Sequence, residues 1–312
     1  MMRPLVLSFF ASLALVSTLS AQTRTLAERL GHPRDAKLLI LHADDIGVAH
    51  SENAASFDAL DEGAINSGSI MMPTPWVTEV AAYAKAHPNA DLGLHLTLNS
   101  EWNTYRWGGL APHDETASLH DLDGTFPRTT DTVAKRAKAD EVERELRAQI
   151  DRAYAIGIRP THVDSHMGAL YQTPELFRTY ARVARSYKLP FLHFIGEADP
   201  AIVATLEPTD VVADAVIMRL QKGSPEEWRR YYLDAIRDMK PGLTVILVHL
   251  GYDDAELRAV TEGWDEWGAD WRQRDYDVLT SAEFRQALKD NGVTLVTWRD
   301  VQRLMYPGAR ID

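Results

Sequence analysis

Short apolar runs alternate with amphipathic stretches along most of the chain. Residues 38–41 form an unbroken apolar run that ends at polar residues and a glycine, a pattern typical of a strand buried on both faces. By the same criterion we expect further short strands at 68–72, 91–98, 161–166, 191–195, 243–250 and 293–298. Helical spacing falls between these runs, at 52–62, 77–86, 140–156, 173–187, 224–239 and 280–291.

Polar residues mark the start of three of these predicted helices. Thr173 is followed by a proline, which suits the first helical position after a cap. Ser224 and Glu227 have the spacing of a capping box, and so have Thr280 and Glu283. These signals place helix starts directly after predicted loops.

Repeated strand–helix units predict an α/β protein. They favour a distorted (β/α) barrel with seven or eight parallel strands, in a single domain covering residues 22–312. No repeat, low-complexity tract or flexible linker divides this region. The segment 99–132 is rich in Trp, Gly, Asp and Pro and is long for a plain connection, so we expect an active-site loop there.

The first 21 residues have the pattern of a signal peptide. Arg3 precedes an apolar run at 5–19, and Ser20 with Ala21 offers a small-residue cleavage point. The run is short for a membrane span and no second one follows it, so we expect no stable membrane anchor. The prediction is an exported protein, either periplasmic or secreted.

Charge and cysteine content narrow the class of partner. The chain carries 33 Lys and Arg against 45 Asp and Glu, a net charge of −12, and no basic run stands out. Nucleic acid is therefore excluded as an expected partner. Because the chain contains no cysteine, its stability outside the cytoplasm would depend on the core and not on disulfides.

Asp44 and Asp45 stand side by side just after the apolar run at 38–41. Adjacent strand residues point to opposite faces, but the backbone turns at a strand end, so both can aim into one cleft. Two carboxylates this close repel each other unless a metal binds one of them, or unless one acts as a base and their pKa values differ. The alternative is that they cap the helix that follows.

Histidines occupy comparable positions on three other strands. His162, Asp164 and His166 alternate along one face of the strand at 161–166, where burying them unpaired would be costly. The alternative there is a hydrogen-bonded polar network. His95 and His249 lie on two further strands, and each alone is more often structural. Together, two histidines and an aspartate would form a good divalent-metal site with positions left for water and substrate.

Four motifs in order along the chain resemble one known family. They are HADDIG at 42–47, GLHLTL at 93–98, THVDSH at 161–166 and VHLGYDD at 248–254. The chain resembles the YdjC-like carbohydrate deacetylases, which include chitooligosaccharide deacetylases and are similar in fold and site to NodB-type polysaccharide deacetylases. The resemblance implies a distorted (β/α) barrel that removes N-acetyl groups from amino sugars or oligosaccharides.

The resemblance also implies a role for individual residues. Asp45, His95 and His166 would bind one divalent metal ion, Mg²⁺ or Zn²⁺. Asp44 would be the general base that takes a proton from water, and His249 the general acid that protonates the leaving amine.

Two neighbours of the implied metal ligands have supporting roles in this hypothesis. Asp164 would orient an imidazole or adjust the basicity of Asp44. His162 would either contact the metal-binding residues from behind or be purely structural. The sequence also departs from the family pattern, because Met167 follows the DSH motif where many members have further histidines. Because of this departure the resemblance does not fix the sugar-binding subsite, and a catalytically silent relative is an open alternative.

Aromatic residues are candidates for stacking on sugar rings. Trp102, Tyr105, Arg106 and Trp107 lie in the long loop and are candidate substrate-binding residues. A second group follows the strand at 243–250 and contains Trp264, Trp267, Trp271, Arg272 and Arg274. Packing under a loop is at least as good an explanation for each tryptophan.

Two other function classes stay open at this stage. A non-haem Fe(II) oxygenase also uses two histidines and a carboxylate, although its usual scaffold is all-β. A carbohydrate-binding protein without turnover would keep the cleft but would not need Asp44 as a base. The sequence leaves the metal, the sugar and the oligomeric state undetermined.

Overall fold

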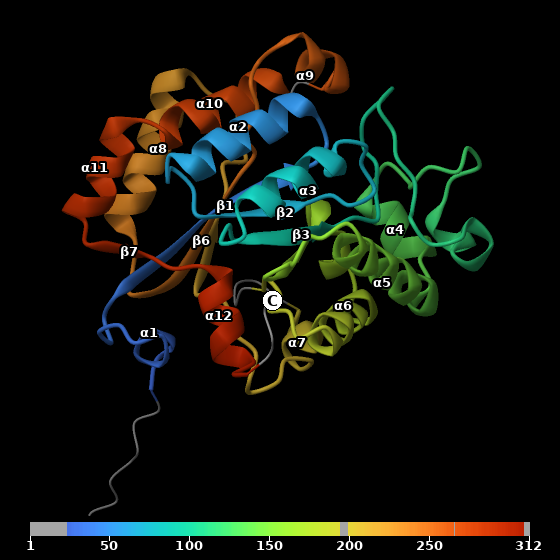
Figure 1. The fold of residues 1–312 in the computed structure, drawn as a ribbon, viewed down its shortest axis with the longest axis horizontal. Coiled ribbons are helices and arrows are strands. Elements are labelled where there is room, and N and C mark those ends of the chain that lie inside the picture. The colour runs from blue at the N-terminus through green and yellow to red at the C-terminus, as the bar shows by residue number, and fades with distance from the viewer. Residues whose placement is uncertain (1–23, 194–198, 265, 309–312) are drawn as a thin grey trace, which may run out of the picture.

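Seven parallel strands make up one curled sheet in the computed structural model, which describes residues 24–193, 199–264 and 266–308 (Figure 1). The order across the sheet is β4-β3-β2-β1-β6-β5, and β7 also pairs with β1. The strands are β1 Lys37–Ile46, β2 Ser67–Ile70, β3 Leu92–Leu96, β4 Val163–Ser165, β5 Ala215–Ile217, β6 Gly242–Val248 and β7 Val293–Leu295. The predicted α/β class and distorted barrel are confirmed, in the form of a half-barrel.

Strand β1 is the centre of this sheet and is almost entirely buried. Strand β6 pairs with it from Lys37 onward along one edge. The other edge is shared, because β7 pairs with its first three residues and β2 with the residues from His42. The Asn66 side chain spans the junction, accepting from the amide of Leu41 at 2.8 Å and donating to the carbonyl of Val296 at 2.8 Å.

Helices surround the sheet. Figure 1 shows α2, α8, α10 and α11 gathered on one side and α4, α5 and α6 gathered beyond β3. Their bounds are α1 Leu26–Arg29, α2 His50–Asp61, α3 Val77–Ala86, α4 Thr130–Arg136, α5 Ala139–Ala155, α6 Pro174–Ser186, α7 Pro200–Val203, α8 Pro225–Asp238, α9 Ala255–Val260, α10 Ala269–Leu279, α11 Ala282–Asp290 and α12 Trp298–Met305. Among these described helices, none combines the length and apolarity needed to cross a membrane.

Most predicted elements are present, but their boundaries shift. At 191–195 the described part holds only an isolated bridge of Phe191 to Val163, and residues 194–198 lie outside the described ranges, as does the predicted signal peptide. The last strand ends at Leu295 and not at 298. Thr297 and Asp300 form a capping box that starts α12 there.

The predicted helix caps are correct at two of three places. Thr173 caps α6, and Ser224 forms the expected capping box of α8. The box predicted at Thr280 is wrong, because the backbone of α11 begins one residue later. Ser281 is its cap and accepts a hydrogen bond from the amide of Phe284.

Candidate metal centre

A backbone irregularity brings Asp44 and Asp45 into one cavity. The pairing of β1 with β2 shifts register between Ala43 and Ile46, and Asp45 has a φ of 64°. This left-handed conformation is uncommon for a residue other than glycine and turns the second side chain toward the side of the first. Both carboxylates line the same cavity. They do not cap α2, whose cap position is Ala49 without a side-chain bond.

Asp45 lies between two histidines from neighbouring strands. Its Oδ1 is 3.4 Å from Nε2 of His95, at the end of β3, and 3.2 Å from Nδ1 of His166, directly after β4. All three side chains are buried. The predicted metal-binding residues are therefore brought together, because the carboxyl ends of β1, β3 and β4 meet at one end of the parallel sheet.

The hydrogen bonds of both histidines leave one nitrogen of each ring facing Asp45. His95 Nδ1 lies 2.7 Å from an Asp164 oxygen, and His166 Nε2 lies 2.9 Å from Oε2 of Glu101. Since a carboxylate only accepts, those ring nitrogens carry protons, and the opposite nitrogen of each ring is the one that can bind a metal when it is deprotonated. Asp45 Oδ1 has no hydrogen-bond partner within the described ranges. Three potential metal-ligand atoms thus lie close together.

A divalent cation fits this convergence. Two ligand atoms that each lie ~2.1 Å from a common ion at a tetrahedral angle are roughly 3.4 Å apart. The distances from Asp45 Oδ1 to the two histidine nitrogens match this spacing. The local field also favours positive charge. Burial alone would lower the pKa of His166, but Glu101 and Asp45 raise it to about 10. Two nitrogens and one oxygen suit zinc and other divalent ions without selecting one.

The second oxygen of Asp45 is held by a buried arginine. Arg272 donates from Nη2 to Asp45 Oδ2 at 2.8 Å, and its Nη1 is 2.6 Å from Oε1 of Glu52. Burial alone would raise the pKa of Asp45, but the guanidinium and His166 hold it well below its usual range. Burial raises the pKa of Glu52 to about 8, against the effect of Arg272. Asp45 is thus kept ionised and in one orientation.

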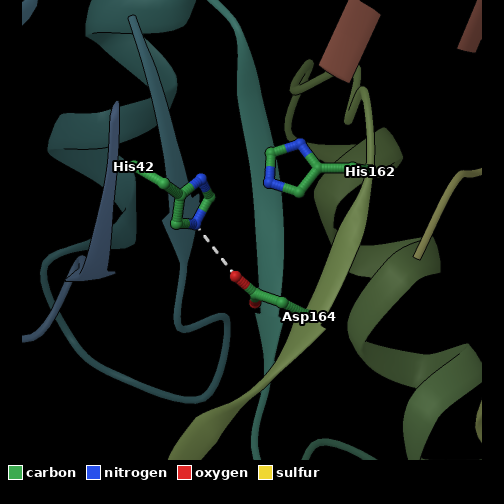
Figure 2. Close-up of side chains that lie close together, drawn as sticks. All are labelled: His42, His162 and Asp164. Carbon is green, nitrogen blue, oxygen red and sulfur yellow. Dashed lines mark ion pairs between the residues drawn. The ribbon is translucent and has the colours of Figure 1, made fainter. Parts of the chain in front are cut away.

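Asp44 belongs to a different network. Its Oδ1 is 3.0 Å from Nε2 of His42 and accepts a longer bond from the Ser69 hydroxyl at 3.3 Å. The same ring nitrogen is 2.9 Å from Asp164 Oδ2, an approach that Figure 2 shows. Burial would lower the pKa of His42, but Asp164 and Asp44 raise it to about 10. His42 is therefore a buried cation between two carboxylates.

His42, His162 and Asp164 form a second cluster with potential metal-ligand atoms (Figure 2). Its atoms are occupied differently, because His42 Nε2 faces two carboxylates and acts as the donor. His162 is bonded through Nδ1 to the Thr161 hydroxyl at 2.9 Å and is stacked on Trp298. Burial holds the pKa of His162 well below its usual range. The two histidines of this cluster support the strands, and neither His42 nor His162 lines the cavity.

His249 lies on the far side of the two aspartates. Its Nε2 is 4.0 Å from Asp44 Oδ2 and 3.9 Å from Asp45 Oδ2. Its backbone amide donates to Asp275 at 3.1 Å, and its ring meets Trp267 edge-on. Burial lowers the pKa of His249 to about 4, although Asp45 opposes this effect. The ring is therefore neutral in this state.

A cavity of about 510 Å³ lies over these groups. Of the aromatic residues proposed to contact a sugar, Trp102, Trp264 and Trp267 line it. Trp271 does not, because it is buried against Trp267 with ring centroids 4.7 Å apart.

The other three candidates in the long loop lie away from the cavity surface. The Tyr105 hydroxyl donates to the carbonyl of Val48 at 2.5 Å, and Arg106 donates to the Thr125 hydroxyl at 2.7 Å. The Trp107 indole donates to the carbonyl of Asn99 at 3.0 Å. These contacts fix the loop itself, so sugar contact by these side chains would need the loop to move.

Several residues of the site were not singled out from the sequence. His42 had a signal, since it lies two positions before Asp44 and so faces the same side of a regular strand. Glu101 and Glu52 had none, and Arg272 was noted only beside the second group of tryptophans. Their roles depend on contacts between segments far apart in the chain.

These features define a class of protein, an α/β half-barrel with a candidate divalent-metal centre at the carboxyl ends of its strands. A family model described as YdjC-like protein matches residues 38–290, and the chain belongs to this family. The family resemblance inferred from the four motifs is thereby confirmed.

Relatives support the same placement over nearly the whole chain. A protein from Thermus thermophilus named carbohydrate deacetylase is 34% identical over 295 residues, covering 90% of this chain and 99% of that one. A relative of the same name from Geobacillus stearothermophilus is 26% identical over 268 residues, covering 85% and 98%.

One solved structure is similar in fold. It is a protein from Enterococcus faecalis named for cellobiose-phosphate cleavage, with a TM-score of 0.74 at 24% identity. The match covers 85% of this chain and 99% of that one, so the two share their fold.

Proposed function

We propose that this protein is a metal-dependent carbohydrate deacetylase, a hydrolase that removes N-acetyl groups from amino sugars or their oligosaccharides. The observation that carries the proposal is the convergence of potential ligand atoms of Asp45, His95 and His166 beside Asp44, in one cavity. The names of the relatives give the same reaction class.

The proposed reaction adds water across the acetamide. A C–O bond forms at the acetyl carbon, the C–N bond breaks, and acetate and a free amine are released without oxidation or reduction. Asp45, His95 and His166 would hold one divalent ion, Zn²⁺ or Mg²⁺. When bound, this ion would polarise the acetyl oxygen and lower the pKa of water.

Asp44 is the proposed general base. One of its oxygens is held by His42 at 3.0 Å, which leaves the other directed toward the cavity and His249. A carboxylate oriented in this way can take a proton from the attacking water. His42 supports the charge of Asp44 and Asp164 would orient His95, so both act through other residues.

His249 is the proposed donor of the proton that the leaving amine needs. With a pKa of about 4, lowered by burial, it is neutral at rest and must first receive a proton. The Asp44 oxygen 4.0 Å away is the nearest group that would hold one after water has been activated. The proton would pass from water to Asp44, then to His249 and finally to the amine nitrogen.

Two variants of adjacent residues test the roles. Asp44→Asn should keep bound metal and lose ~10²-fold or more in acetate release from N-acetylated sugars. Asp45→Asn, like His95→Ala, should lose the metal, measured by elemental analysis. Equal metal loss in both aspartate variants would remove the base assignment.

Two alternative functions have defined signatures. An Fe(II) oxygenase would consume oxygen and need iron, and the parallel α/β sheet is not its usual scaffold. A carbohydrate-binding relative would bind sugars and release no acetate with any divalent metal. Acetate release by metal-reconstituted protein over a panel of N-acetylated sugars separates all three.

We also propose that residues 1–21 are a signal peptide and that the mature domain, 22–312, acts in the periplasm or outside the cell. The support is the apolar run after Arg3. N-terminal sequencing of protein from its native host should find a start near Ala21 or Gln22. A chain that retains Met1 would contradict the proposal.

A further inference from the structure

The cavity has a polar base and an apolar wall. The wall combines side chains on and after β6 and β5 with side chains beside β4, the strand at the opposite end of the sheet. Its side chains are Tyr171, Leu192, Val216, Met218, Leu220 and Leu247. An acetamide group needs only the base of the cavity, so this wall is available to another part of the substrate.

The wall continues outward to the mouth. Leu220 is 62% exposed and Met167 is 49% exposed, and both line the cavity. Among the described residues, only six large hydrophobic side chains are exposed, and two of these six lie at this mouth. Exposed apolar side chains that border a cleft are typical of a binding surface for an apolar group.

No free positive charge faces the cavity from the described part of the chain. Arg272 is the only Lys or Arg among the described lining residues, it is 2% exposed, and it is engaged by Asp45 and Glu52. Asp44, Glu101 and Asp164 add negative charge to the lining. Sites for phosphate or carboxylate groups use arginine, lysine or helix N-termini, and the described lining offers no such cation to a sugar phosphate.

We propose that this cleft selects an uncharged N-acetylated glycoside with an apolar aglycone and discriminates against phosphorylated and acidic sugars. The proposal rests on the proposed deacetylase function and names its substrate class. The acetamide lies at the base beside Asp44, the sugar ring contacts Trp264 and Trp267, and the aglycone packs on the wall that ends at Leu220.

Three substrates that share one sugar test this selection. They are N-acetylglucosamine, its 6-phosphate and its phenyl β-glycoside, each assayed for acetate release by the metal-reconstituted protein. Because apolar contacts in a pocket discriminate by ~10-fold or more, kcat/KM for the phenyl glycoside should exceed that for the free sugar by about 10-fold. The 6-phosphate should be the poorest substrate. A 6-phosphate turned over as well as the phenyl glycoside would overturn the proposal.

A pair of leucine variants locates the effect. Leu220→Asp should lower kcat/KM for the phenyl glycoside by about 10-fold more than for the free sugar, and so remove most of the preference for the phenyl glycoside. Leu122→Asp is the matched control, because Leu122 is fully exposed and does not line the cavity. Equal preference in the two variants would refute the assignment of the wall.

Failure of the deacetylase function has a separate signature. If none of the three compounds releases acetate, calorimetric titration of the wild-type protein with each of them still tests the cleft. Tighter binding of the phenyl glycoside than of the 6-phosphate, lost in Leu220→Asp, supports the proposed selectivity without turnover. Equal affinities, or tighter binding of the 6-phosphate, would overturn it.

Discussion

Arg272→Met tests whether one guanidinium compensates two buried carboxylates. Arg272 contacts Asp45 at 2.8 Å and Glu52 at 2.6 Å, and the three side chains are at most 3% exposed. Methionine keeps much of the apolar stem and removes the charge. Apart from its ion pair with Arg272, Glu52 accepts no hydrogen bond in the described part of the chain, so at a pH above its pKa of about 8 the substitution leaves its charge uncompensated.

The expected loss follows from the burial of this group. Removing one partner from a buried ion pair costs about 3–5 kcal/mol, because the remaining charge stays desolvated. For a chain of this size that loss corresponds to a decrease in Tm on the order of 10 °C in metal-free protein. A divalent cation bound beside Asp45 would replace part of the missing positive charge. The loss should therefore be smaller in metal-saturated protein.

Urea unfolding monitored by circular dichroism, at a pH above the Glu52 pKa of about 8, measures these differences. Wild type, Arg272→Met, Glu52→Gln and the double variant are compared after chelation and again with excess metal. The double variant should be more stable than Arg272→Met alone, because it removes the uncompensated carboxylate. Arg258→Met is the control, since that arginine is 65% exposed in its pair with Asp253 and should cost less than about 1 kcal/mol.

Two results would refute this reasoning. One is a loss in Arg272→Met no larger than in Arg258→Met. The other is a double variant less stable than Arg272→Met, since the added Glu52→Gln change would then relieve nothing. Either result would mean that water or protonation compensates Glu52 without the arginine.

Three further predictions concern single residues. Glu101→Ala should weaken metal binding ~10–100-fold in a calorimetric titration, because His166 loses the partner that fixes its ring. In metal-free protein, His42→Asn should lower the free energy of unfolding by a few kcal/mol below pH ~6.5. Because the pKa of His42 is raised to about 10, the stability that its charge provides is lost as the pH rises through that value. The difference from wild type in urea unfolding should therefore vanish toward pH 10. Gly93→Ala should lower stability by ~1–3 kcal/mol in the same assay, because its Cβ would overlap the buried ring of His162.

The sheet was largely predictable from the sequence because its strands are short and apolar and lie between amphipathic helices. Helix α3 has the expected bounds, and α5 differs by one residue at each end. Strand β5 was missed although it lies in a short apolar run at 215–218, between Asp214 and Arg219. Helices α9 and α10 were missed as well, since polar residues and tryptophans interrupt their pattern.

The candidate site was predictable where its residues lie at strand ends. Asp45, His95 and His166 could be grouped because parallel strands bring their carboxyl ends together, and their role as metal ligands stays a prediction. Arg272 could not be paired with Asp45, because nothing local to α10 indicates its partner on β1. The same holds for Glu101, whose partner His166 is reached only through the folded loop.

The late partners of β1 in the sequence have a consequence during synthesis. Strand β2 follows after a single helix, whereas Lys37 pairs with Gly242 in β6 and with Val293 in β7. At ~5–20 residues per second, roughly 10–40 s pass between the emergence of Lys37 and that of its β6 partner from the ribosome. Until then this buried apolar strand keeps one edge open to pairing with other chains. Nascent-chain crosslinking should find this strand bound to chaperones until the C-terminal third has been made.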